Sequence, residues 1–284
     1  MISQETVWKK IWPAVEQLIE ATLAEDDEAV AALLFSGEEA AVLHDLFGFT
    51  VFDILLKTVL GREELAVTRA IETENGKYVH VEYVWPDPEA GDGRYTAADL
   101  VTVQLRKQRD RWRVVAVNPA AADVPLTEAR AISILASSGT LGENGRAPQE
   151  PWILPVALFC GSLQLPLRPQ AMADAVEALL LPGLQHRAYG VLSLVAGRRL
   201  WRDFKAKATP DLEPAAAWAA AAEFIVNEQS LREMTQAAVG KHYRVNLAPV
   251  LPRIRQIKET LDIQGLDARY TALQRTQIVF ADKE

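Results

Sequence analysis

The chain has 284 residues, of which 49% are hydrophobic and 24% are charged, and its formal net charge at pH 7 is −8. This balance is typical of a folded globular protein and excludes long disordered segments, and the length favours two domains. The acidic balance argues against a general attraction of the molecule to nucleic acid or anionic lipid, so any contact with nucleic acid must be local.

The single cysteine and the N-terminal residues bear on the cellular compartment. Cys160 lies in the apolar run LPVALFCGSLQLP, so no intramolecular disulfide can form and a buried, inert thiol is expected. Residues 1–27 alternate charged and apolar residues and lack the continuous apolar run of a signal peptide or a membrane span. We therefore expect a cytoplasmic protein with no membrane association.

The first part of the chain has the periodicity of helices. Residues Thr6–Ala24 carry apolar residues at steps of three and four, which predicts one amphipathic helix with a wide apolar stripe. Shorter helices are predicted for Asp27–Leu34, Glu38–Leu46 and Val51–Leu60, and Gly61 is expected to end the last of them.

The pattern then changes to that of strands, from Glu64 to Val117. An Asn75-Gly76 turn separates two alternating runs, and a second hairpin is predicted around Arg109-Asp110, which gives four antiparallel strands. The alternation predicts an apolar face with Val79, Val81, Tyr83, Trp85, Val101, Val103 and Leu105. It predicts a polar face with Tyr78, His80, Glu82, Thr102 and Gln104.

Helices followed by a curved antiparallel sheet that ends in the run DRWRVVAVN resemble the nuclear-transport-factor-2-like fold, also called the cystatin-like cone. The resemblance implies an α+β N-terminal domain in which helices and sheet enclose a cone-shaped pocket, and enzymes of this family place an acid and a histidine inside it. As lining for a small apolar ligand we expect Trp12, Phe52, Tyr83 and Trp85.

The sequence offers no catalytic or metal motif, and we assign no catalytic residue, metal ligand or cofactor. The chain has four histidines, which show no two-ligand spacing: His44, His80, His186 and His242. His44 and Asp45 are neighbours on a predicted helix and point about 100° apart, so an acid–base pair would have to come from distant residues. His80 and Glu82 share a strand face, but it is the polar one, and Asp53 and Asp99 are the alternative pocket acids.

A linker is expected at 137–152, which is rich in glycine, proline and polar residues, after a helix at Pro125–Ala136. The predicted domains are 1–136 and 153–284, and the second is all-α. Its expected helices are Ile153–Gln164, Pro169–Leu181, Leu184–Lys205, Pro214–Asn227, Leu231–Tyr243, Pro252–Leu261 and Leu266–Gln274. The alanine-rich run EPAAAWAAAAEFIV predicts a buried central helix, and the basic run Ala196–Lys207 a solvated face at a helix C-terminus.

The run MTQAAVGKHYRVNLAPVLPRIRQIKETL has the layout of a helix-turn-helix. Thr235 suits the start of a first helix, with Ala238 and Val239 facing inward. Val245 is the expected apolar anchor of the turn, and Asn246 caps a second helix whose inward stripe is Val250, Ile254, Ile257 and Leu261. Together with the alanine-rich run upstream, residues Pro214–Leu261 resemble the second cyclin-type repeat of relatives of transcription factor IIB, which implies descent from a DNA-binding segment.

Two prolines alter this helix-turn-helix. Pro249 falls in the first turn, where it is tolerated, but Pro252 would remove a hydrogen bond and clash with the carbonyl of Ala248, so we expect the helix to restart at Pro252. The tip of the second helix is apolar and offers no group for reading bases. We predict a degenerate, structural motif without specific recognition of nucleic acid, and phosphate contacts are available only from Lys241, Arg244, Arg253, Arg255 and Lys258.

Three functions follow as hypotheses. The leading one is a non-enzymatic, two-domain cytoplasmic protein whose cone domain binds a small apolar ligand or another protein, with homodimerisation through the sheet, and whose helical domain is an interaction module. The alternative is a DNA-associated regulator with a ligand-sensing cone domain. The third is a cyclase- or isomerase-like enzyme that uses His80 or His44.

Overall fold

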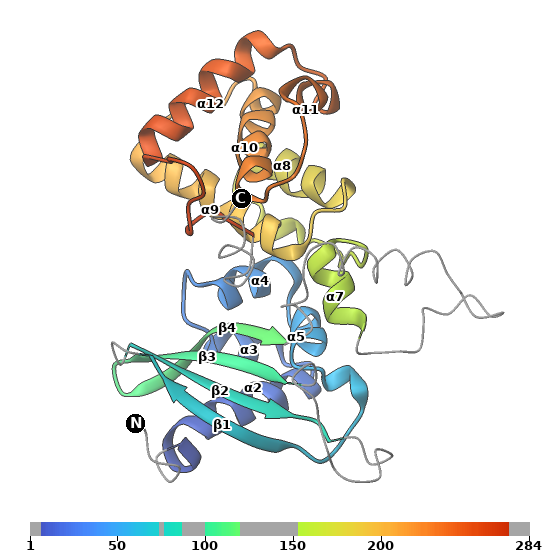
Figure 1. Cartoon of the computed structure of the whole chain (residues 1–284), viewed down its shortest axis with the longest axis vertical. Coiled ribbons are helices and arrows are strands. Elements are labelled where there is room, and N and C mark those ends of the chain that lie inside the picture. The colour runs from blue at the N-terminus through green and yellow to red at the C-terminus, as the bar shows by residue number, and fades with distance from the viewer. Residues whose placement is uncertain (1–6, 74–76, 87–99, 120–152, 273–284) are drawn as a thin grey trace, which may run out of the picture. The chain divides into compact units, whose positions relative to one another are not determined.

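The computed structural model describes residues 7–73, 77–86, 100–119 and 153–272. The chain divides into two compact units, Met1–Leu158 and Phe159–Glu284, and the fold is mixed α+β with a four-stranded antiparallel sheet (Figure 1). The division falls inside α7 (Ile153–Cys160). The predicted linker at 137–152, the helix at Pro125–Ala136 and the Asn75-Gly76 turn lie outside the described residues.

The first predicted helix is two elements in the structure. A short π-helix, η1 (Val7–Ile11), precedes α2 (Trp12–Leu23). Pro13 has no amide hydrogen to extend the α pattern backwards, so α2 begins next to it. Of the predicted apolar stripe, Ile11, Trp12, Val15, Leu18 and Ile19 are buried, whereas Leu23, at the C-terminal end of α2, is 59% exposed.

Three shorter helical elements follow. The helix α3 (Asp27–Leu33) starts at Asp26, whose side chain accepts a 2.9 Å hydrogen bond from the amide of Ala29, and α4 (Glu39–Phe47) comes next. The predicted helix over Val51–Leu60 is wrong, because the structure has α5 (Thr50–Leu55) and a separate 3₁₀ turn, η2 (Thr58–Leu60). Lys57, between the two, has a left-handed φ of 59°, a conformation that ends a helix.

The sheet confirms both predicted hairpins. Its strands are β1 (Ala66–Glu72), β2 (Tyr78–Val84), β3 (Val101–Gln108) and β4 (Arg111–Pro119), paired antiparallel in chain order. Arg109 has a left-handed φ of 56° in the turn between β3 and β4. Bulges interrupt the register at Val67/Arg69 and at Gln104/Leu105, and such bulges bend the strands.

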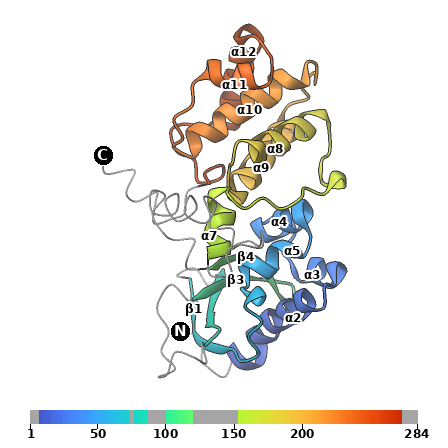
Figure 2. The same cartoon turned by 90° about the vertical axis from the view of Figure 1, so that its right-hand side faces the viewer.

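The apolar face of the sheet is covered by helices of the same unit. Figures 1 and 2 show α2, α3, α4 and α5 on one side of the strands, and all four contact β4. The predicted inward residues are buried, as listed here: Val79, Val81, Tyr83, Trp85, Val101, Val103 and Leu105. Of the predicted polar face, Glu82 is also buried, because Arg69 pairs with it through Nε–Oε2 and through Nη2–Oε1 at 3.0 Å.

The described elements of the second unit are helical. After α7 they are η5 (Pro169–Ala171), α8 (Ala175–His186), α9 (Val191–Lys207), α10 (Ala215–Gln229), α11 (Gln236–His242) and α12 (Leu247–Leu261). As predicted from its alanines, α10 is the buried central helix: Ala217 and Ala219–Ala222 have no exposed surface, and α8, α9, α11 and α12 contact it.

Several predicted helix boundaries in this unit are wrong. The helix predicted to reach Gln164 ends at Cys160, because Gly161 has φ of 80° and its backbone approaches Ala188 too closely for a side chain. Cys160 itself is half-buried, less so than expected. The helix predicted over Pro169–Leu181 is replaced by η5 and α8, and α8 continues through Pro182. The last predicted helix is absent from its described part, residues 266–272, which forms turns.

Candidate functional site

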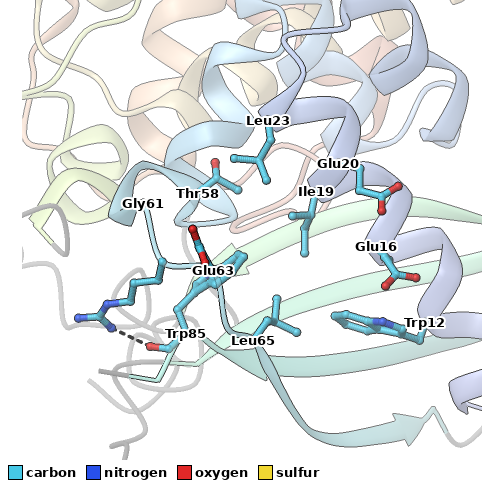
Figure 3. Close-up of a pocket in the computed structure, with 11 residues that line it drawn as sticks. Trp12, Glu16, Ile19, Glu20, Leu23, Thr58, Gly61, Glu63, Leu65 and Trp85 are labelled. Carbon is cyan, nitrogen blue, oxygen red and sulfur yellow. Dashed lines mark hydrogen bonds between the residues drawn. The ribbon is translucent and has the colours of Figure 1, made fainter. Parts of the chain in front are cut away.

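The first unit contains a cavity of about 530 Å³ between α2 and the chain that leads from η2 into β1 (Figure 3). Trp85, the residue after β2, also belongs to its wall. The residues that line the cavity are Trp12, Glu16, Ile19, Glu20, Leu23, Thr58, Gly61, Arg62, Glu63, Leu65 and Trp85.

Helical spacing explains why α2 supplies so much of the lining. Its contributions are Trp12, Glu16, Ile19, Glu20 and Leu23, at steps of one, three and four residues, so they share one face of the helix. The facing wall comes from an extended segment after Gly61, whose φ of 63° ends η2. The site therefore joins segments that are about 40 to 70 positions apart in the sequence.

The cavity has an apolar floor. Trp12 is 8% exposed, and Ile19 and Trp85 are each 6% exposed, so all three are fixed by packing. Leu65 adds a half-buried apolar side chain. The guanidinium of Arg62 donates a 2.7 Å hydrogen bond from Nη1 to the carbonyl of Trp85 and holds that wall in place.

A hydrogen-bonded aromatic group stands behind this floor. The hydroxyl of Tyr83 and the indole Nε1 of Trp85 both donate to the carbonyl of Leu56, at 2.9 and 2.8 Å. The Tyr83 ring contacts Trp12 and Trp85 edge-on, with centroid distances of 6.1 and 6.0 Å, a favourable arrangement of aromatic rings. Burial raises the pKa of Tyr83 well above its ordinary value, so the hydroxyl remains a donor.

The four predicted pocket residues are thus divided between cavity and core. Trp12 and Trp85 line the cavity. Tyr83 lies behind them, and Phe52 is fully buried with its ring 6.4 Å from the ring of His44. Sequence reasoning missed the carboxylates of Glu16, Glu20 and Glu63, although the first two are visible as an i, i+4 pair on the amphipathic helix.

The candidate acid–base residues do not line this cavity. His44 pairs with the distant Asp27, with Nε2 3.1 Å from Oδ1 and 3.1 Å from the main-chain oxygen. Asp27 also accepts from the amide of Phe49 at 3.0 Å, so the pair ties α3 to the end of α4. Asp53 accepts the hydroxyl of Thr58 at 2.5 Å.

The remaining candidates of this kind give no site either. Asp99 lies outside the described residues, and His80 is on the strand face opposite the buried one. Within the described ranges, no group of three or more His, Cys, Asp or Glu side chains is arranged to hold a metal ion.

No helix in the described part of the chain is long and apolar enough to cross a membrane.

In the second unit the helix-turn-helix layout is present as α11, a turn and α12. Thr235 caps α11 and accepts from the amide of Ala238 at 3.2 Å, and Asn246 is the residue before α12. Val239 is buried, but Ala238 is exposed, contrary to expectation. Val245 is half-buried, and its amide donates to the carbonyl of Gly240 at 2.9 Å.

The predicted restart of the helix at Pro252 is wrong. The helix α12 runs without a break from Leu247 to Leu261. Both Pro252 and Ala248, whose carbonyl would otherwise bond to the amide at position 252, are exposed, so the lost hydrogen bond lies on the solvent side of the helix. Side chains on either side of the proline hold α12 in place because they are buried: Val250, Ile254, Ile257 and Leu261.

The five predicted phosphate contacts do not form one surface. The guanidinium of Arg253 lies 4.8 Å from the ring of Trp218 and donates to the carbonyls of Pro249 and Glu213 at 2.8 and 2.9 Å. Lys258 forms a 2.6 Å ion pair with Glu228. The other three are exposed: Lys241, Arg244 and Arg255.

The prediction for the basic run Ala196–Lys207 also needs correction, because several of its cations are engaged in contacts within the protein. Arg198 is buried and donates to the carbonyl of Ala171 at 3.2 Å. Arg202 pairs with the buried Glu177, at 2.7 Å from Nε to Oε1, and Lys205 pairs with Asp174. These three cations bind α9 to η5 and to the start of α8, whereas Lys207, at the end of the run, is exposed.

Sequence reasoning also missed a buried polar network in the second unit. Glu223 of α10 has no exposed surface, and both carboxylate oxygens are engaged by Arg187 and by the hydroxyl of Tyr243, the latter at 2.6 Å. Arg187 Nη2 also donates to that hydroxyl at 3.0 Å. A lone acid in an alanine-rich buried helix is a signal for such a partner, because an unpaired buried charge is costly.

Comparisons of the chain with protein-family models, with curated proteins and with solved structures found no match.

Proposed function

We propose that this chain is a non-enzymatic binding protein whose first unit, a cone of the nuclear-transport-factor-2-like type, holds a small and mainly apolar ligand. The cavity between α2 and the segment before β1 carries the proposal. Its volume of about 530 Å³ suits a small organic molecule, and small-molecule sites are mostly concave and apolar with a few polar groups.

The position of the cavity differs from the centre of the cone. The inward side chains of β2 and β3, such as Val81 and Val103, have no exposed surface, so packed side chains fill the space over the middle of the sheet. Room for a ligand lies at the edge, where Trp12 and Trp85 end the packed core. The floor of the cavity is preformed by the buried side chains of Trp12, Ile19 and Trp85, and a preformed surface needs little rearrangement on binding, which favours affinity.

The acid–base candidates that involve a histidine lie away from the cavity, and no histidine is among the residues that line it beside Glu16, Glu20 and Glu63. The Asp27–His44 pair joins two helices, and Glu82 is occupied by Arg69. Neither lies on the cavity wall, where a general acid or base would need to be within hydrogen-bonding reach of a ligand.

A fluorescent apolar probe tests this function. N-phenyl-1-naphthylamine should bind the full-length chain with a saturable rise in fluorescence. Leu65→Trp fills the cavity and should abolish the rise, whereas Leu179→Trp, at an exposed position of α8, should leave it unchanged. No saturable binding, or equal binding by the Leu65→Trp variant, would overturn the proposal.

For the second unit we propose an interaction module built on a degenerate cyclin-type, helix-turn-helix segment. Association with DNA remains the alternative, and its support is the exposed charge of Lys241, Arg244 and Arg255. The exposed tip of α12 carries Ala248, Leu251 and Pro252, which cannot read base edges.

A selection from random DNA duplexes separates the module from the regulator. We expect weak binding, sensitive to salt and without a preferred sequence, because cations alone contact phosphate. A defined motif that is lost on combining Lys241→Ala with Arg255→Ala, but kept in a Lys207→Ala control, would favour the regulator.

A further inference from the structure

We infer that the ligand of the first unit is a cation: an amine or quaternary ammonium group on an apolar body. This inference rests on the proposed function, since it names the chemical class that the same cavity would bind. The observation behind it is that three carboxylates and one arginine line a cavity with an apolar floor.

The carboxylates come from two walls. Glu16 and Glu20 are one turn apart on α2, and Glu63 lies on the segment across the cavity from them (Figure 3). All three are exposed to solvent. Within the described part of the chain none of the three has an ion-pair partner, so their charge is available to a ligand.

The one cation of the lining does not offset this charge inside the cavity. Arg62 is half-buried, and its Nη1 is used in the 2.7 Å hydrogen bond to the carbonyl of Trp85. Three carboxylates against one guanidinium leave the cavity with negative potential, which attracts cations and repels carboxylate or phosphate ligands.

The floor has the matching chemistry for the rest of such a ligand. Trp12 and Trp85 line it, and indole rings are the strongest aromatic partners of organic cations. Ile19 and Leu65 provide aliphatic surface for a hydrocarbon body. An apolar chain can therefore lie against the floor while its ammonium group reaches the carboxylates.

Three probes of similar size and different charge test the inference: octylamine, 1-octanol and octanoate. Titration calorimetry with the full-length chain near pH 7 should rank octylamine first and octanoate last. Glu20→Gln and Glu63→Gln should each weaken octylamine binding about two- to five-fold, the range for single exposed charge pairs. The affinity for 1-octanol should not change in these variants. Added NaCl should lower the affinity for octylamine towards that for 1-octanol, because salt screens the carboxylates.

A matched control uses Glu28→Gln, an exposed acid of α3 outside the cavity lining, which should leave all three affinities unchanged. Equal affinities for octylamine and 1-octanol, or preference for octanoate, would overturn the inference and leave the cavity as a binding site. If the octyl probes fail to bind while N-phenyl-1-naphthylamine binds, the inference alone fails. If neither kind of probe binds, the proposed function fails as well.

Discussion

At the scale of single residues, Glu223 is a fully buried charge at the centre of a polar network in the second unit. Arg187 and Tyr243 satisfy its carboxylate, and burial lowers the pKa of Arg187 and raises that of Tyr243. Glu223→Ala leaves the arginine buried without its partner, so we expect a loss of about 3–5 kcal/mol in the free energy of unfolding, measured by urea denaturation. The comparison is Glu228→Gln, on the same helix α10 as Glu223, which breaks a solvent-accessible ion pair with Lys258 of α12 and should cost less than about 1 kcal/mol. Equal losses of stability in the two variants would contradict a stabilising role for the buried network around Glu223.

Asp174, the residue before α8, gives a prediction on pH. Its burial acts to raise its pKa, but hydrogen bonds from Lys205, from the amide of Glu177 and from Trp201 together lower it. A carboxyl whose pKa is lower in the folded state stabilises the fold above its unfolded pKa of about 3.9, and this contribution is lost as the pH falls through the folded pKa. Asp174→Asn should therefore reduce stability at neutral pH.

The same substitution should make the unfolding midpoint in urea depend less on pH below about 4. The control is Glu233→Gln, at an exposed position of the same unit, which should keep the pH dependence of the native chain. A steep acid transition that persists unchanged in Asp174→Asn would show that another group controls it.

At the scale of elements, α12 is held by its buried stripe and tolerates an exposed proline. Ile254→Ala removes a side chain that is 7% exposed and should cost about 2–4 kcal/mol, with the size set by the cavity left behind. Leu251→Ala, at a position of the same helix that is 43% exposed, should cost less than about 1 kcal/mol. Thermal unfolding of both variants measures the difference, and similar losses would mean that the stripe does not anchor α12.

The elements also show where sequence reasoning works and where it stops. The strand faces were predictable because alternation is local: Val79 and Val81 point inward whatever covers them. The break after α5 was not, since it lies at Lys57, whose left-handed backbone its residue type does not predict. Pro252 was judged by propensity alone, and tertiary packing on both sides of it outweighed the lost hydrogen bond.

The candidate site was predictable only in part for the same reason. Trp12 and Trp85 were found as large aromatic residues of a predicted cone. Glu63 and Leu65 belong to an irregular segment without periodicity, and only the packed structure brings them opposite α2. Tertiary contacts between distant segments leave no local pattern, so the sequence does not reveal that Glu63 lies across a cavity from the Glu16–Glu20 pair.

At the scale of the whole molecule, the burial of aromatic residues changes the case for a homodimer. The expectation rested on Tyr83 and Trp85 needing cover, but they have 0% and 6% of their surface exposed within one chain. These side chains therefore do not themselves require a partner surface, and the predicted homodimer stays a prediction, which the mass by light scattering at tens of micromolar tests. A stable dimer would have to use another surface.

The most direct test of ligand binding by the first unit is a titration with N-phenyl-1-naphthylamine followed through the indole N–H resonances of ¹⁵N-labelled tryptophan. The resonances of Trp12 and Trp85 should shift in a saturable way, because both rings line the cavity. Those of Trp201 and Trp218, which belong to the aromatic cluster of the second unit, should stay in place. Absence of a shift at Trp12 and Trp85, or a shift confined to Trp201 and Trp218, would contradict a ligand-binding site between α2 and β1.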